Sequence, residues 1–264
     1  MISKSLRDQR RSLLGWSLGL SAFLTLYLGV VYPSIVQDPA TYSAQALAKY
    51  PGALRDLMGG LQDFATALGF LQSVVYQLMV PALFVVCAVG LAGRSLAGPE
   101  ESGTFELVVT LPMSRRSLVA RLFAALALGL LIVAAVTLLV VCALAAGTGM
   151  DVGFDRILAA HTGVYLLALL FGTVTLAVGA ATGRRAVASA AVGAWAVLGY
   201  MVVTVGRNVE AVAWLKWVSP FHYYAEGRPL YQGLPAGDYL VLAGAVAVFA
   251  FVAVLTFDRR DVGV

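Results

Sequence analysis

Six long stretches of the chain contain no Asp, Glu, Lys or Arg, and they restrict its fold more than any other feature. They cover residues 13–32, 72–93, 122–146, 157–181, 186–205 and 239–257 of 264. A helix needs roughly 20 apolar residues to cross the hydrocarbon layer of a membrane, and in lipid a helix satisfies its own backbone polar groups. The sequence therefore predicts an all-α integral membrane protein with six transmembrane helices in a single domain, residues 1–264.

The basic residues are distributed unevenly between the loops. With six spans both termini lie on one side, and that side holds 12 of the 18 Lys and Arg residues: Lys4, Arg7, Arg10, Arg11, Arg94, Arg115, Arg116, Arg121, Arg184, Arg185, Arg259 and Arg260. Cytoplasmic loops carry an excess of basic residues. We therefore expect a multi-pass protein of the plasma membrane with both termini in the cytoplasm. Because topology accounts for the positive charge, we expect no nucleic-acid partner.

No motif for nucleotide hydrolysis occurs in the sequence. A phosphate-binding loop needs a lysine that directly follows a glycine, whereas the three lysines follow serine, alanine and leucine. His161 and His222 have no second ligand at metal-binding spacing, and we interpret both as polar residues at the membrane interface. We therefore expect no catalytic residue, metal or cofactor on this chain, so that any energy for transport comes from another subunit.

Polar residues within the spans are uncharged. The spans lack the carboxylates that mark proton-coupled carriers, which argues against a secondary carrier. Gln72, Tyr76 and Gln77 lie close to Pro81, which distorts a helix, and we expect these four residues to line a path for the substrate. For most other polar and small residues, as in GTVTLAVGAATG, close packing between helices is the better interpretation.

The segment before the sixth span reads SPFHYYAEGRPLYQG. Proline interrupts a helix that would run through this segment. Ser219, Pro220 and Phe221 therefore predict a re-entrant or broken helix. The alternative is a plain belt of aromatic residues at the level of the lipid headgroups.

A compact polar segment, residues 98–118, separates the second and third spans on the side that holds the termini. Glu100 and Glu101 suit the first turn of a helix, where the helix dipole favours negative charge. Ser114 can cap a helix that begins at Arg115 and continues into the third span. These signals predict a short amphipathic element across the cytoplasmic face. The alternative is a surface helix that only covers the bundle.

This segment, EESGTFELVVTLPMSRRSLVARL, resembles the cytoplasmic loop of permease subunits of ABC exporters of the type 2 class (ABC-2). The family pattern has two or three acids, Gly-Thr, an apolar residue, Glu, leucine-rich residues, a proline and Ser-Arg. Phe105 stands where leucine is commoner. The sequences GFLQSVVYQLMVPALF and SPFHYYAEGRPLYQG are also similar to the family, so the resemblance extends over the six spans.

The resemblance implies a coupling helix that docks on a separate ATPase, with Arg115 and Arg116 anchoring its exit; its residues would be Glu100, Glu101, Gly103, Thr104 and Glu106. Two permease subunits, identical or different, would pair with two ATPases that bind ATP and Mg, all within membrane lipid. ATP hydrolysis by the partner would then drive a substrate out of the cytoplasm. The alternatives are a non-transporting membrane anchor or assembly factor and, less favoured, a secondary carrier.

Overall fold

The computed structural model of the chain describes residues 2–38, 41–42, 49, 64, 66–95, 114–206 and 213–259, with side chains from Gln9 onward except at Val205. All regular structure in these ranges is helical. Six helical stretches are long and apolar enough to cross a membrane: Gln9–Gln37, Ala67–Ser95, Arg115–Gly147, Phe154–Thr182, Arg185–Thr204 and Ala236–Arg259. Each predicted apolar stretch coincides with one of them, so the prediction of an all-α integral membrane protein is confirmed.

Two of the spans combine α-helix with π-helix. The first consists of α1 (Ile2–Leu26), the π-helical η1 (Tyr27–Val31) and α2 (Tyr32–Gln37). The second consists of α5 (Ala67–Phe70), the π-helical η3 (Leu71–Met79) and α6 (Val80–Ser95). A π-helix bonds each N–H to the carbonyl five residues back, and such segments often lie at functional sites. The other four spans are α9 (Arg115–Gly147), α10 (Phe154–Thr182), α11 (Arg185–Val205) and α15 (Ala236–Arg259).

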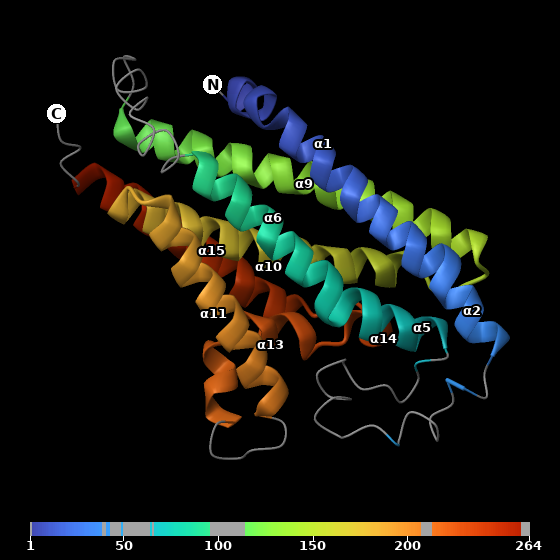
Figure 1. Cartoon of the computed structure of the whole chain (residues 1–264). Coiled ribbons are helices and arrows are strands. Elements are labelled where there is room, and N and C mark those ends of the chain that lie inside the picture. Colours follow the sequence, from blue (N-terminus) through green and yellow to red (C-terminus); the bar gives the residue numbers. More distant parts are fainter. Residues whose placement is uncertain are drawn as a thin grey trace.

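Helix α10 forms the centre of the bundle. It packs against α6, α9, α11 and α15, and the ribbon shows it among these helices (Figure 1). Gly172 permits a close approach, since a Cβ atom there would lie 3.0 Å from Leu126 Cδ2 of α9 and 3.2 Å from Ala88 Cβ of α6. Small residues let helix backbones come close, so the packing interpretation holds at this glycine.

A left-handed glycine ends α10. Gly183 has a φ of 67° and follows the last helical residue, Thr182, and its N–H donates to the carbonyl of Gly179. Residues with a Cβ atom rarely adopt this conformation, so glycine is the common residue at such helix ends. The chain reverses here and α11 begins at Arg185.

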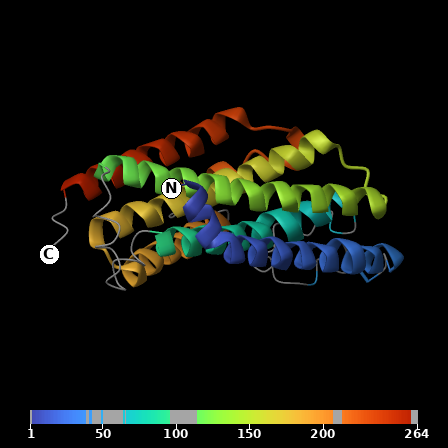
Figure 2. The same ribbon diagram turned by 90° about the horizontal axis from the view of Figure 1, so that it is seen from above.

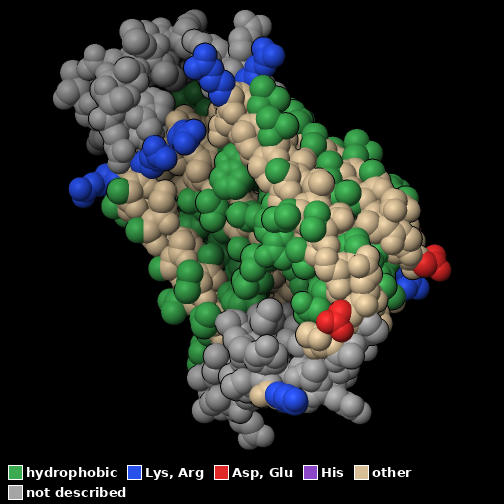
Figure 3. All heavy atoms as spheres, turned by 45° about the vertical axis from the view of Figure 1, so that its right-hand side comes forward, with side chains coloured by type: hydrophobic (Ala, Val, Ile, Leu, Met, Phe, Trp, Pro, Cys, Tyr) green, Lys and Arg blue, Asp and Glu red, His purple; other side chains and the backbone are tan. Residues whose placement is uncertain are grey.

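The termini lie toward one end of the bundle. Helix α1 begins and α15 ends at the same end, whereas α2 and α5 lie at the other (Figures 1 and 2). Between the two ends the molecule presents a broad hydrophobic surface (Figure 3). Among the exposed leucines, Leu18 of α1, Leu139 of α9 and Leu240 of α15 are 70%, 68% and 72% exposed. Soluble proteins rarely expose so much contiguous apolar surface, so this surface suits contact with lipid.

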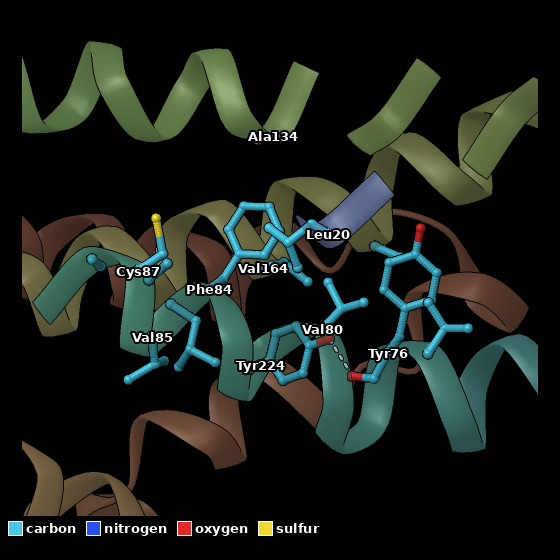
Figure 4. Packing of buried hydrophobic residues seen from close by; sticks show 14 of the residues in the cluster. Leu20, Tyr76, Val80, Phe84, Val85, Cys87, Ala134, Val164 and Tyr224 are labelled. Carbon is cyan, nitrogen blue, oxygen red and sulfur yellow. Dashed lines mark hydrogen bonds between the residues drawn. The ribbon is translucent and has the colours of Figure 1, made fainter. Parts of the chain in front are cut away.

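Among the described residues, the interior holds one large apolar cluster and one small one. Leu20, Phe84 and Val164 bring α1, α6 and α10 together in the large cluster (Figure 4). The small cluster lies near the end of the bundle where α15 finishes; its members are Val119, Leu122, Leu176, Ala177, Ala180, Ala253 and Phe257.

The chain between α11 and α15 is broken into short pieces, as predicted. A 3₁₀-helix, η4 (Trp214–Val218), is followed by α13 (Pro220–Ala225) and α14 (Pro229–Gln232). Pro220 and Pro229 occupy the first positions of the two short α-helices, where a missing N–H costs nothing. This segment packs beside α10, α11 and α15.

Candidate functional site

The exit of the polar segment is built on the first turn of α9. Ser114 Oγ accepts a hydrogen bond from the N–H of Ser117 at 3.3 Å, and α9 begins at Arg115. The cap expected from the sequence is therefore present. The Ser114 side chain satisfies an N–H group that the helix itself leaves unpaired. Of the residues assigned to ATPase docking, Glu100, Glu101, Gly103, Thr104 and Glu106 lie outside the described residues, and their role stays a prediction.

Arg116 joins the start of α9 to the end of α15. Its Nε and Nη2 donate to Asp258 Oδ2 at 3.0 and 2.8 Å. The Arg116 side chain is largely exposed, and exposed ion pairs contribute little to stability. The pair therefore bridges two spans at the exit of the polar segment and adds little to the stability of the fold.

The predicted path residues of the second span lie mainly in the interior. Tyr76, Gln77 and Pro81 are buried, and Gln72 is partly exposed. The Tyr76 hydroxyl lies 2.6 Å from His161 Nδ1 of α10. The carbonyl of Tyr76 accepts a hydrogen bond from the Tyr224 hydroxyl of α13 (Figure 4). Tyr76 thus connects three elements that are far apart in the sequence, and a path along these residues stays a prediction.

An apolar groove lies beside these residues, between α6 and α11. Its volume is about 630 Å³, and Leu78, Val85 and Val89 line one wall. Gly193 and Tyr200 of α11 line the other wall, together with Phe221 of α13. None of Gln72, Tyr76, Gln77 and Pro81 lines this groove.

The three residues assigned to the broken segment are all buried. Ser219 Oγ donates to the carbonyl of Gly199 at 2.8 Å and accepts from the N–H of Phe221 at 3.2 Å. The Phe221 ring lies 5.6 Å from the Phe171 ring and 5.5 Å from the Tyr200 ring, measured between centroids. Helix α13 is therefore seated between the spans.

Both interpretations of the aromatic residues describe part of this segment. Trp214 and Trp217 of η4 are 65% and 59% exposed, as expected of an aromatic belt, whereas Phe221 and Tyr224 of α13 are buried.

Comparison with known families decides what kind of protein this is. A family model described as ABC-2 family transporter protein matches residues 1–262. The chain belongs to this family. It is thus a multi-pass membrane protein and a transmembrane subunit of an ABC transporter. No curated protein matches the chain.

The interpretation of His161 needs correction for this ABC-2 protein. We expected an interfacial side chain, but His161 is 3% exposed within the bundle. Its Nδ1 also lies 3.3 Å from the carbonyl of Ile157, and its Nε2 has no hydrogen-bond partner among the described residues. The sequence shows only an apolar run around this histidine, so its partner, Tyr76, was not predictable.

Two further tyrosines of the ABC-2 protein were not singled out as site residues from the sequence. The Tyr239 hydroxyl of α15 donates to the carbonyl of Ala159 at 3.0 Å, and the Tyr224 hydroxyl donates to Tyr76 as described above. Buried tyrosine hydroxyls usually find such partners. The sequence placed Tyr224 among the residues of an aromatic belt. Only the predicted helix break at Ser219–Pro220 indicated that it could be buried instead.

Proposed function

We propose that this ABC-2 subunit is the permease of an ATP-driven exporter, in which two permease subunits and two separate ATPases form the complex. The family match over residues 1–262 carries the proposal. The absence of a glycine–lysine phosphate-binding loop from the sequence supports a separate ATPase that binds ATP and Mg. The chain itself then forms a single membrane domain without catalytic chemistry.

The charge distribution supports an orientation with cytoplasmic termini. The ends of the spans near the termini carry Arg94 of α6, Arg121 of α9 and Arg184 before α11. The opposite ends carry several acids: Asp38, Asp151, Asp155, Glu226 and Asp238. A basic cytoplasmic side is the usual arrangement in the plasma membrane, and in this orientation we expect residues 98–118 to face the cytoplasm and the ATPase.

The architecture of α9 supports a mechanical role for the docking segment. Helix α9 contains 33 residues, so it is about 50 Å long at 1.5 Å per residue. A helix of this length transmits a displacement of its first turn to the other side of the membrane. Closure of the ATPases would push on residues 98–118, and the Arg116–Asp258 pair would carry α15 with α9. The spans would then exchange inward and outward access.

A charge reversal at the docking segment tests this function. Glu100→Lys with Glu101→Lys places positive charge where we infer an interface with the ATPase. Unfavourable charge contacts at an interface cost several kcal/mol, so we expect an ATPase activity of the purified complex about tenfold lower, or more. Membrane insertion, followed by cell fractionation, remains unchanged.

Asp151→Lys is the matched control, because Asp151 is exposed at the opposite end of the bundle. It should leave ATPase activity intact. Unchanged activity in the double variant would contradict the docking role. A different result would indicate a membrane anchor. In that case the double variant would bind less ATPase, but the ATPase that stayed bound would hydrolyse ATP at its full rate.

A further inference from the structure

The second span contains a carbonyl group that its own backbone leaves without a donor. In η3 the hydrogen bonds connect residues five apart, and at its end the Val80 N–H donates to the carbonyl of Val75. The next donor in this register would be residue 81, and its acceptor would be the carbonyl of Tyr76. Residue 81 is proline, which has no N–H. The Tyr76 carbonyl is buried in the bundle and therefore needs a hydrogen bond from elsewhere.

Tyr224 supplies that hydrogen bond from the broken segment. Its hydroxyl donates to the Tyr76 carbonyl, and both residues are buried, with 3% and 1% exposure (Figure 4). Helix α13 is held in place independently, since Ser219 caps it and donates to the carbonyl of Gly199 in α11. The donor thus comes from an element that has its own anchor.

The side chain of Tyr76 is held as well. Its hydroxyl lies 2.6 Å from His161 Nδ1, so the residue contacts α13 through its carbonyl and α10 through its ring. A shift of residue 76 along α10 or away from α13 would break a buried hydrogen bond. The second span also forms one wall of the groove beside α11, and Phe221 of α13 lines the same groove.

We propose that Tyr224 is a positioning residue, whose hydroxyl replaces the backbone donor missing at Pro81 and thereby holds the π-helical part of the second span against α13, beside the groove. The contacts of Tyr76 with Tyr224 and His161 lie within one chain and do not depend on the proposed function. The consequence for transport rests on the proposed function, because the groove would change its shape during each transport cycle. Loss of the Tyr224 hydroxyl then alters the rate of the cycle without weakening ATPase binding.

A double-mutant cycle between Tyr224 and Pro81 tests this assignment. Tyr224→Phe removes only the hydroxyl. Pro81→Ala restores an N–H that can donate to the Tyr76 carbonyl in the existing register. In lipid nanodiscs we expect Tyr224→Phe to lower the melting temperature of the permease by about 2–4 °C. In the Pro81→Ala background the same change should have little effect, because the carbonyl already has a donor.

Tyr223→Phe is the matched control. Tyr223 is the neighbouring residue, and its hydroxyl donates to the carbonyl of Trp217 outside the span. Tyr223→Phe should have the same effect on the melting temperature with and without Pro81→Ala, and it should leave the ATPase rate unchanged. Equal effects of Tyr224→Phe in the two backgrounds would overturn the assignment of the donor.

The ATPase rate of the complex separates this inference from the proposed function. Tyr224→Phe should change the maximal rate severalfold at unchanged ATPase binding, and Pro81→Ala should restore it. An additive cycle in the isolated permease disproves the positioning role even if the complex hydrolyses ATP. A non-additive cycle in a chain that binds no ATPase supports the contact and contradicts only the proposed function.

Discussion

Gly163 of α10 shows how closely individual residues approach in the half of the bundle away from the start of α9. A Cβ atom at this position would lie 2.8 Å from Tyr239 Cζ of α15. Tyr239 is buried, and its hydroxyl donates to the carbonyl of Ala159 one turn earlier in α10. A rigid ring held at its hydroxyl cannot move aside easily. The close approach of Tyr239 to α10 therefore requires a residue without a side chain at position 163.

Gly163→Ala should destabilise the protein by about 1–3 kcal/mol, the usual cost of overfilling a packed site. The Tyr239 ring must shift, and its hydrogen bond to Ala159 lengthens or breaks. Thermal unfolding in detergent measures the loss. Gly244→Ala is the control, since no neighbouring side chain lies within 4 Å of a Cβ atom there. Equal melting temperatures for the two variants would disprove the contact.

At the level of elements, a local contact and a distant one meet at the start of α9. Its cap is local, because Ser114 and Ser117 are three residues apart, whereas Arg116 and Asp258 are 142 residues apart. The local bond sets where the helix begins. The distant pair connects α9 to α15, which a cap cannot do.

A charge swap tests the junction between α9 and α15. Arg116→Asp places two acids together, and we expect the ATPase rate of the complex to fall severalfold while stability changes little, because the pair is exposed. Arg116→Asp combined with Asp258→Arg restores an attractive pair and should recover most of the rate. Failure of the swap to recover activity would show that the pair does not transmit movement from the docking segment.

The described residues form a bundle, and the face drawn in Figure 3 is apolar in its middle with charged side chains toward both ends. The end that holds the start of α1 and the finish of α15 also holds the start of α9. Because α6 ends and α9 begins at that end, the orientation of the bundle in the membrane decides whether an ATPase can reach the segment that joins them.

A single cysteine at position 103 reports this orientation. The natural cysteines, Cys87 and Cys142, lie within spans and can be replaced by alanine. We expect a membrane-impermeant maleimide to label Gly103→Cys in inside-out vesicles and not in intact cells. Asp151→Cys, at the opposite end of the bundle, should show the reverse pattern. Labelling of position 103 from outside would overturn the orientation.

The sequence by itself determined the features that depend on composition and on neighbouring residues. Six uncharged runs predicted six spans, Ser114 predicted the start of α9, and Ser219–Pro220 predicted the break before α15. The polar segment at 98–118 indicated the family. Each of these signals is local, since the length of an apolar run, a cap or a proline acts within a few residues.

Only the tertiary structure decided which residues meet. Tyr76 contacts His161 and Tyr224, which are 85 and 148 residues away. In a soluble helix an apolar stripe shows which face turns inward, but in a membrane the lipid-facing side is as apolar as the core. The spans therefore carry no pattern that predicts their rotation, and packing between them places Tyr224 on the carbonyl that Pro81 leaves without a donor.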